Sequence, residues 1–261
     1  MNSQSPARPG RSATNAEVAL AGVSAAPYYQ DEHTTVYNAD ALDILPCLTS
    51  GSIDLCVTDP PYIIGAVSTG SMRSKSGSWS DMMNSALWFT EWYRMVADAL
   101  ADDGAMWSFL NWKTLPVTTK AAMTAGLPLT SMMVWDKETI GPGGPSGLRP
   151  SYEMCALMAG PEFRIPNRST SDIWRFKTST RKPNGHPAEK PVGLVEQIIK
   201  ASEVREGGTI LDPFVGSGTT AVAARRAGLR SVVIEAEERY CEVVARRMEV
   251  WGAADSLCVA A

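Results

Sequence analysis

Two short segments, far apart in the chain, combine residue types that could act together on a nucleic-acid base. The first is Asp59-Pro60-Pro61-Tyr62, which directly follows the apolar run 53–57. The second is the glycine-containing segment 212–220, which directly follows the apolar residues 209–211. Each segment begins where a buried strand is expected to end, and open α/β sheets bind their ligands at that edge. The sequence therefore predicts that both segments belong to one site.

The Asp-Pro-Pro-Tyr segment is suited to activating an exocyclic amino group. Such a group is a poor nucleophile, because its lone pair is delocalised into the ring. The carboxylate of Asp59 and the carbonyl of Pro60 could accept both amino hydrogens out of the ring plane, and Pro60 with Pro61 would stiffen the loop. Tyr62 offers a flat face for stacking, and a base from a duplex would have to be flipped out to reach it. The alternative is an ordinary Asp-Pro turn with Tyr62 in the core.

The glycine segment is suited to holding a nucleoside-bearing cofactor. Gly216 and Gly218 allow close approach of a ligand, and the helix expected to begin near Thr219 points free N–H groups at it. Glu235, at the end of the next strand, could accept hydrogen bonds from both ribose hydroxyls. The loop also fits the loose Gly-x-Gly-x-x-Ala dinucleotide fingerprint. A nicotinamide-dependent oxidoreductase, a binding module without catalysis and a loop without ligand therefore remain alternatives, whereas no lysine follows Gly218 as a P-loop requires.

Hydrophobic periodicity predicts strands that alternate with helices, which is typical of a doubly wound α/β sheet with helices on both faces. We expect strands at 34–37, 53–58, 105–110, 129–135, 152–158, 209–211 and 231–235. We expect helices at 41–48, 82–101, 114–125, 191–202, 219–227 and 238–251.

Composition is that of an ordinary soluble globular protein. Of the 261 residues 44% are apolar and 20% charged, with a formal net charge of −4. No apolar run is long enough for a membrane span, and the five cysteines are scattered without a CxxC pair, so we expect a cytoplasmic protein with reduced thiols and no metal site. The absence of hydrophobic periodicity in residues 1–26 predicts a flexible tail, and we expect residues 27–261 to form a single catalytic domain.

Basic residues in irregular segments could contact DNA phosphates if the fold brings them to one face, although a solvated surface explains them equally well. Residues 161–185, with the loops 63–81 and 141–150, predict a small target-recognition region. The candidates for DNA binding are Arg73, Lys75, Trp79, Arg149, Arg164, Arg168, Arg175, Lys177, Arg181 and Lys182.

The two motifs in this order resemble the β group of amino DNA methyltransferases, which use S-adenosylmethionine. The resemblance covers roughly residues 34 to 250 and includes 38–40, 135–137, 186–191 and 234–235. It implies a seven-stranded Rossmann-like sheet with one antiparallel strand. Asp59, Pro60, Pro61 and Tyr62 would form the catalytic pocket. The cofactor would be bound by Asp40, Lys190, Asp212, Pro213, Phe214, Gly216, Ser217, Gly218, Thr219, Thr220 and Glu235.

The resemblance also implies roles for individual positions. Asp40 would bind the adenine of the cofactor and Glu235 its ribose, whereas Lys190 and Thr219 would lie near its methionine part. Cytosine-N4 members usually have serine in place of Asp59, which favours adenine-N6 over cytosine-N4 in double-stranded DNA. An RNA or a protein amide substrate remains an alternative. The short recognition region indicates a short target site or a second subunit. A homodimer and a cognate restriction nuclease are candidate partners.

Overall fold

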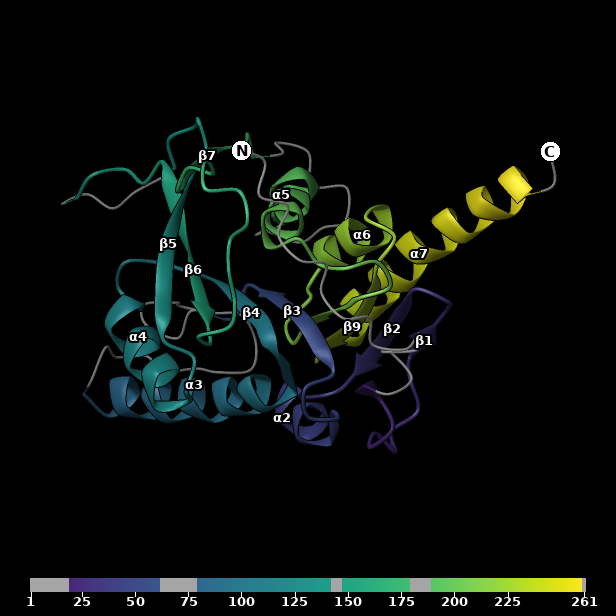
Figure 1. The fold of residues 1–261 in the computed structure, drawn as a ribbon, viewed down its shortest axis with the longest axis horizontal. Helices are drawn as coiled ribbons and strands as arrows, with labels where there is room; N and C mark the ends of the chain where they lie inside the picture. Colours follow the sequence, from purple (N-terminus) through teal and green to yellow (C-terminus); the bar gives the residue numbers. More distant parts are fainter. Residues whose placement is uncertain (1–18, 62–78, 142–146, 179–188, 260–261) are drawn as a thin grey trace, which may run out of the picture.

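The computed structural model describes residues 19–61, 79–141, 147–178 and 189–259, which contain nine strands and seven helical segments (Figure 1). The strands are β1 (Tyr29–Gln30), β2 (Thr34–Asn38), β3 (Ile53–Thr58), β4 (Leu100–Leu110), β5 (Leu129–Asp136), β6 (Tyr152–Ala159), β7 (Ile173–Arg175), β8 (Thr209–Asp212) and β9 (Arg230–Glu235). The helices are α2 (Ala41–Ile44), the 3₁₀ helix η1 (Leu45–Cys47), α3 (Trp79–Ala99), α4 (Leu115–Thr124), α5 (Val192–Ser202), α6 (Thr219–Arg226) and α7 (Glu238–Val259), with a single helical residue at Ala19.

All nine strands form one sheet in the order β1-β2-β9-β8-β3-β4-β6-β5-β7. The pairs β2–β9, β9–β8, β8–β3, β3–β4 and β5–β7 are parallel, whereas β6 runs antiparallel to both of its neighbours. The seven expected strands, with one antiparallel member, form the middle of the sheet. The sheet has nine strands and not seven, because β1 and β7 add a short strand at each edge, and β1 is a second antiparallel strand. Edge strands this short carry too little apolar pattern to be recognised in the sequence.

The strands alternate their side chains between two apolar cores, one on each face of the sheet. In β4, Met106 and Leu110 belong to one buried cluster, while Trp107 and Phe109 belong to the other. This period of two is the pattern of a strand that is covered on both sides. Helices α2, η1, α3 and α4 lie on the first face, and α5, α6 and α7 lie on the second (Figure 1).

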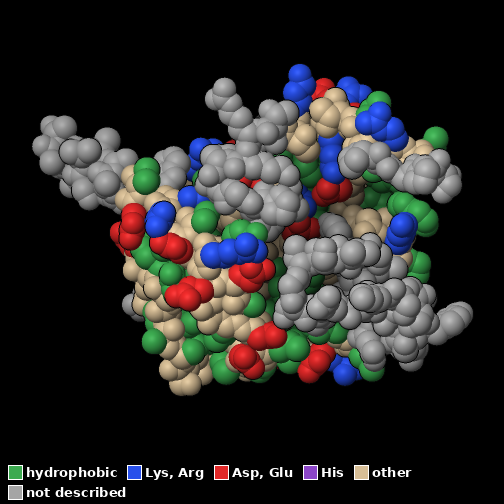
Figure 2. Space-filling model, turned by 180° about the vertical axis from the view of Figure 1, so that it is seen from behind, with side chains coloured by type: hydrophobic (Ala, Val, Ile, Leu, Met, Phe, Trp, Pro, Cys, Tyr) green, Lys and Arg blue, Asp and Glu red, His purple; other side chains and the backbone are tan. Residues whose placement is uncertain are grey.

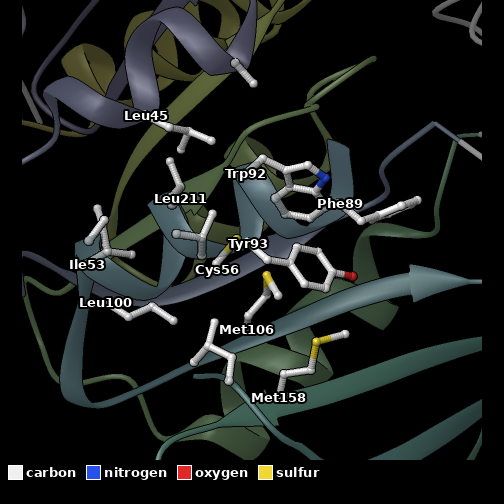
Figure 3. Packing of buried hydrophobic residues seen from close by; sticks show 14 of the residues in the cluster. Leu45, Ile53, Cys56, Phe89, Trp92, Tyr93, Leu100, Met106, Met158 and Leu211 are labelled. Carbon is white, nitrogen blue, oxygen red and sulfur yellow. The ribbon is translucent and has the colours of Figure 1, made fainter. Parts of the chain in front are cut away.

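The first core is rich in aromatic side chains from α3. Phe89, Trp92 and Tyr93 are almost completely buried, and they pack over Met106 and Met158 from the sheet (Figure 3). The rings of Trp92 and Tyr93 meet edge to face, with centroids 4.2 Å apart. Because large aromatic side chains bury the most apolar area, this core anchors α3 beneath the middle of the sheet.

Several boundaries differ from the expected ones. Helix α3 begins at Trp79 and ends at Ala99, and β4 begins at Leu100, so Asp102-Asp103-Gly104 lies within a strand. The segment 160–188, expected to be irregular, contributes β7. The predicted tail also differs, because Ala19 is fully buried and its carbonyl accepts a 3.0 Å hydrogen bond from the N–H of Thr49. Leu20 and Val23 are partly buried against the same core, so these residues of the segment 1–26 belong to the folded domain.

Candidate active site

Four acidic residues follow four neighbouring strands at the carboxyl edge of the sheet. Asp40 follows β2, Glu235 ends β9, Asp212 ends β8 and Asp59 follows β3. Neighbouring strands lie about 4.8 Å apart, so three spacings place β2 about 14 Å from β3. That distance suits an extended nucleoside-bearing molecule. The two motifs predicted to form one site thus lie on adjacent strands and on the same edge.

The carboxylate of Asp59 is bound by Lys190, which comes from the segment before α5. The Lys190 ammonium donates a hydrogen bond to Oδ2 of Asp59, and it lies 5.0 Å from the centre of the Phe109 ring. The Lys190 side chain is only 8% exposed. Burial lowers the pKa of Lys190, but the carboxylates of Asp59 and Glu153 outweigh it and raise that pKa above its ordinary value. Lys190 is therefore a permanent cation beside Asp59.

A second carboxylate shares this lysine. Oε2 of Glu153, in β6, lies 3.3 Å from Nζ of Lys190, and Oε1 of Glu153 accepts a hydrogen bond from Lys137. Burial raises the pKa of Glu153, but Lys190 and then Lys137 outweigh it, so that the pKa lies below its ordinary value. Neither Glu153 nor Lys137 was among the predicted site residues. The signal for Glu153 was present, since it is the single charged residue of an otherwise apolar strand.

Helix α7 ties the lysine segment to the glycine loop. Arg247 donates a 3.0 Å hydrogen bond to Glu189 and a 2.7 Å hydrogen bond to the carbonyl of Ser217. The hydroxyl of Thr219 donates to the carbonyl of Lys190, at 3.2 Å. The segment that carries the lysine is thus held by two contacts from the cofactor side of the site. No pattern in the sequence pointed to Arg247.

The glycine loop has the conformation that its residue types predict. Gly216 and Gly218 both have positive φ, at +51° and +87°, which disfavours any residue with a side chain. Gly218 caps α6, and no side chain accepts from the first N–H groups of the helix. These groups can therefore bind an anionic group such as the carboxylate of an amino acid, as a nucleoside-bearing methionine would require.

The carboxylate of Glu235, at the end of β9, is hydrogen-bonded to the same loop. Its Oε2 accepts from the N–H of Gly216 and its Oε1 from the N–H of Glu237, both at 2.9 Å. Burial raises the pKa of Glu235 above its ordinary value. Each oxygen keeps a further lone pair, so the fixed carboxylate can also accept from two ribose hydroxyls. Asp40 is exposed, and its Oδ1 caps α2 by accepting from the N–H of Leu42 at 3.0 Å.

Asp212, the first residue of the glycine-containing segment, is buried. Its Oδ1 accepts from the N–H of Phe214 at 3.1 Å, and Thr220 also donates to it. Burial is the largest cause that raises the pKa of Asp212 to about 7, and the negative charge of Asp59 adds to it. A cationic ligand in this position would favour the ionised form.

The next residues of the loop are held from below by the aromatic core. The ring of Phe214 lies 5.2 Å from that of Trp92 and 5.5 Å from that of Trp88, both measured between centroids. Pro213, Ser217 and Thr219 are buried. Helix α3 therefore supports the floor of the loop, which the spacing of its apolar residues alone could not reveal.

The predicted DNA-binding residues that the structure describes are exposed at the β7 end of the sheet or in the loops beside it. Basic side chains gather at the upper right of Figure 2, the end of the molecule that carries β7 in that view. Some of these side chains have partners, since Arg175 lies 3.4 Å from Asp136 and Nε of Arg149 donates to the carbonyl of Gly141. The exposed basic candidates are Arg149, Arg164, Arg168, Arg175 and Lys177.

Several predictions fall outside the described part of the chain. They concern Tyr62, Arg73, Lys75, Arg181, Lys182 and the side chain of Trp79. Within the described part, no helix combines the length and the apolar character needed to cross a membrane.

Comparison with known proteins agrees with this geometry. The model of a family described as DNA methylase matches residues 53–246, which include both motifs and Lys190. The chain belongs to this DNA methylase family. The family consists of S-adenosylmethionine-dependent methyltransferases of exocyclic amino groups, at N6 of adenine or N4 of cytosine. The motif order is that of the β group, and the oxidoreductase alternative is not supported.

Individual relatives share the family and the fold. The type II methyltransferase M.ScaI of Streptomyces caespitosus is 27% identical over 269 residues, which cover 85% of this chain and 84% of the relative. Among solved structures, the cytosine-N4-specific PvuII DNA methyltransferase has a TM-score of 0.69 and 19% identity, with 84% of this chain and 87% of that chain covered. A complex of M1.HpyAVI with S-adenosylmethionine has a TM-score of 0.64 and 20% identity, with 82% and 98% covered. The DNA adenine methyltransferase YhdJ of Escherichia coli is 24% identical over 260 residues, which cover 85% of each chain, so the proteins similar to this DNA methylase differ in base specificity.

Proposed function

We infer that this DNA methylase transfers a methyl group to the N6 amino group of adenine in a base flipped out of double-stranded DNA. The observation that carries the proposal is the acid at the first position of the motif, Asp59, because cytosine-N4 members of the family usually have serine there. Asp59 follows a strand adjacent to the one that carries the glycine loop. The amino group would thus meet its acceptors beside the methyl donor.

The proposed catalytic step depends on two acceptors. The carboxylate of Asp59 and the carbonyl of Pro60 accept the two amino hydrogens, and they draw the nitrogen lone pair out of the ring plane toward the methyl group. S-adenosylmethionine, when bound, supplies an electrophilic methyl group on a positive sulfur, whose carbon–sulfur bond breaks with its electron pair on sulfur. The amino nitrogen loses one proton, which Asp59 accepts and passes to water.

The cofactor roles follow the order of the strands. Asp40 would accept from the adenine amino group of the cofactor, Glu235 would bind the ribose, and the N-terminus of α6 would bind the carboxylate. Support comes from the order β2, β9, β8, β3, which matches the order of these groups along an extended cofactor. Lys190 was expected near the methionine part, and its contact with Asp59 favours a role between cofactor and target.

DNA recognition stays a prediction, which rests on the positive charge and the position of exposed basic residues. Arg149, Arg175 and Lys177, near the start of β6 and the end of β7, would neutralise phosphates beside the catalytic edge, whereas Arg164 follows the end of β6 at the opposite edge. The aromatic Tyr62 and Trp79 would lie near the flipped base. Binding to phosphates should weaken steeply as salt is added. A homodimer and a cognate restriction nuclease likewise stay predictions.

The proposal is tested by product analysis. The protein is incubated with radiolabelled S-adenosylmethionine and unmethylated plasmid DNA, and the DNA is digested to nucleosides. Label in N6-methyladenine supports the proposal. Label in N4-methylcytosine, the second candidate given the similarity in fold to a cytosine-N4 enzyme, overturns the choice of base but not the family chemistry.

A further inference from the structure

A partly buried row of alternating charges extends away from the proposed catalytic carboxylate. It runs from Asp59 to Lys190, then to Glu153 and finally to Lys137. Asp59 follows β3, Glu153 belongs to β6, Lys137 follows β5 and Lys190 lies in the segment before α5, with β4 between β3 and β6 in the sheet. The four formal charges cancel, which is what a partly buried cluster requires.

Asp59 can accept a hydrogen bond from an amino group more readily if Lys190 also interacts with a second carboxylate. The ammonium of Lys190 has three N–H donors, and a single carboxylate beside it would experience the whole of its electrostatic attraction. Asp59 would then be bound by Lys190 and less able to accept from an amino group. The second carboxylate, on Glu153, lies 3.3 Å from the ammonium and shares its charge, while the ammonium donates to Oδ2 of Asp59.

Glu153 is itself held in place. Lys137 binds its other oxygen, and Lys137 in turn lies 5.3 Å from the centre of the Trp135 ring. Trp135 and Glu153 are partners across the β5–β6 pair, so their relative position is fixed by the register of the sheet. The orientation of Glu153 therefore depends on backbone pairing and not on a mobile loop.

We propose that Glu153 is a positioning residue for methyl transfer, which acts through Lys190 to set the orientation and charge of the Asp59 carboxylate. Glu153 touches neither the target base nor the cofactor in this scheme. The inference rests on the proposed role of Asp59, and it adds a residue from β6 to a site otherwise made from the strand ends of β2, β9, β8 and β3.

The test is a double-mutant cycle with Glu153→Gln, which keeps the shape of the side chain and removes its charge. Single-turnover methyl transfer, cofactor affinity and DNA affinity are measured for wild type, Glu153→Gln, Lys190→Met and the double variant. Glu153→Gln should lower the transfer rate at least about tenfold, while both affinities change by less than about twofold. In the Lys190→Met background the same substitution should change the rate by less than about twofold, because its route to Asp59 is already lost.

Two outcomes would overturn the inference: an unchanged transfer rate in Glu153→Gln, or an equal loss with and without Lys190. Glu196→Gln is the matched control, because Glu196 forms an exposed ion pair with Arg226 at 3.1 Å on the surface of α5, and it should leave the rate unchanged. If circular dichroism shows that Glu153→Gln does not fold, Lys137→Met replaces it in the cycle. That substitution removes the contact that holds Glu153 in place and keeps Glu153 itself. A wild type without amino methylation would instead overturn the proposed function.

Discussion

The ammonium of Lys190 donates a hydrogen bond to the carboxylate of Asp59, although 131 residues separate them in the chain. The parallel strands β3 and β8 make this contact possible, because they bring the Asp-Pro-Pro segment beside the loop that Lys190 approaches. The family resemblance of the HPAEKP segment pointed to the cofactor, and the contact with Asp59 could not be read from it. The site is therefore best understood as one ionic arrangement rather than two independent motifs.

Asp59→Ala should abolish most of the methyl transfer and leave cofactor binding nearly intact. The variant removes one of two acceptors for the amino group and leaves Lys190 with Glu153 alone. We expect a loss on the order of 100-fold or more in single-turnover rate. Cofactor affinity is measured by calorimetry on the same preparation.

The control for this substitution is Asp102→Ala, at an exposed position near the start of β4, on the edge of the sheet opposite Asp59. It should transfer methyl groups at the wild-type rate. Normal transfer by Asp59→Ala would show that another group accepts the amino hydrogens.

Glu235→Ala should weaken cofactor binding much more than it slows transfer at saturating cofactor. The variant removes the acceptor proposed for the ribose and also frees the N–H groups of Gly216 and Glu237. Hydrogen bonds to a charged group contribute about 1.5–3 kcal/mol each, so an affinity loss of roughly tenfold to a hundredfold is expected. An unchanged dissociation constant would remove Glu235 from the cofactor site.

Gly218→Ala should destabilise the protein and weaken cofactor binding. A Cβ at this position would lie 3.0 Å from Cγ2 of Val244, and the backbone φ of +87° is unfavourable for alanine. Strain and crowding together should cost about 1–3 kcal/mol, measured by urea unfolding.

Gly228→Ala is the matched control for Gly218→Ala. Gly228 has φ of +67° but open space around its Cβ, so it should show the backbone cost alone, about 1 kcal/mol, and normal cofactor affinity. Val244→Ala should recover part of the loss in Gly218→Ala. If both glycine variants behave alike, contact with Val244 has no energetic role.

Asp212→Asn should make stability less dependent on pH. The pKa of Asp212 is raised from 3.8 to about 7 in the folded protein, chiefly by burial, so the unfolded chain releases its proton first as pH rises. Ionisation of Asp212 therefore does not change the free energy of unfolding below about pH 4. It lowers this free energy increasingly between about pH 4 and 7, and the total loss levels off above about pH 7 at about 4 kcal/mol.

The measurement for Asp212 is urea unfolding at several pH values between 5 and 8.5, in the absence of cofactor. Asn cannot ionise, so the free energy of unfolding of wild type should fall relative to that of the variant and then level off above about pH 7. A difference that stays constant over this range would mean that Asp212 keeps an ordinary pKa.

Long periodic segments and motif positions were predicted well, whereas contacts made at a distance were not. The strands before Asp59 and Asp212 were expected from their apolar runs, since a buried strand has a strong local signal. β7 was missed because three residues that alternate exposed and buried carry almost no pattern. The start of β4 was missed because Asp102-Asp103-Gly104 has the composition of a turn, and only pairing with β3 overrides it.

In the site itself, features that depend on residues close together in the sequence could be predicted. Contacts between residues that only the fold brings together could not. The glycine conformations followed from residue type, and the carboxylate of Glu235 from its position after a strand. Glu153 and Arg247 act through ion pairs with residues 16 to 58 positions away, from the pair of Glu153 with Lys137 to the pair of Arg247 with Glu189. Such pairs have no spacing rule in one sequence.

The pairing of β2 with β9 joins residues near the two ends of the chain, Thr34 with Ser231 through Asn38 with Glu235. Asp40 and Glu235 follow or end these paired strands, so the part of the sheet edge that carries both carboxylates forms only when segments 197 residues apart, as in the pair Asn38–Glu235, have come together. Pairing over such a sequence separation is slow, so we expect this end of the sheet to assemble late in folding.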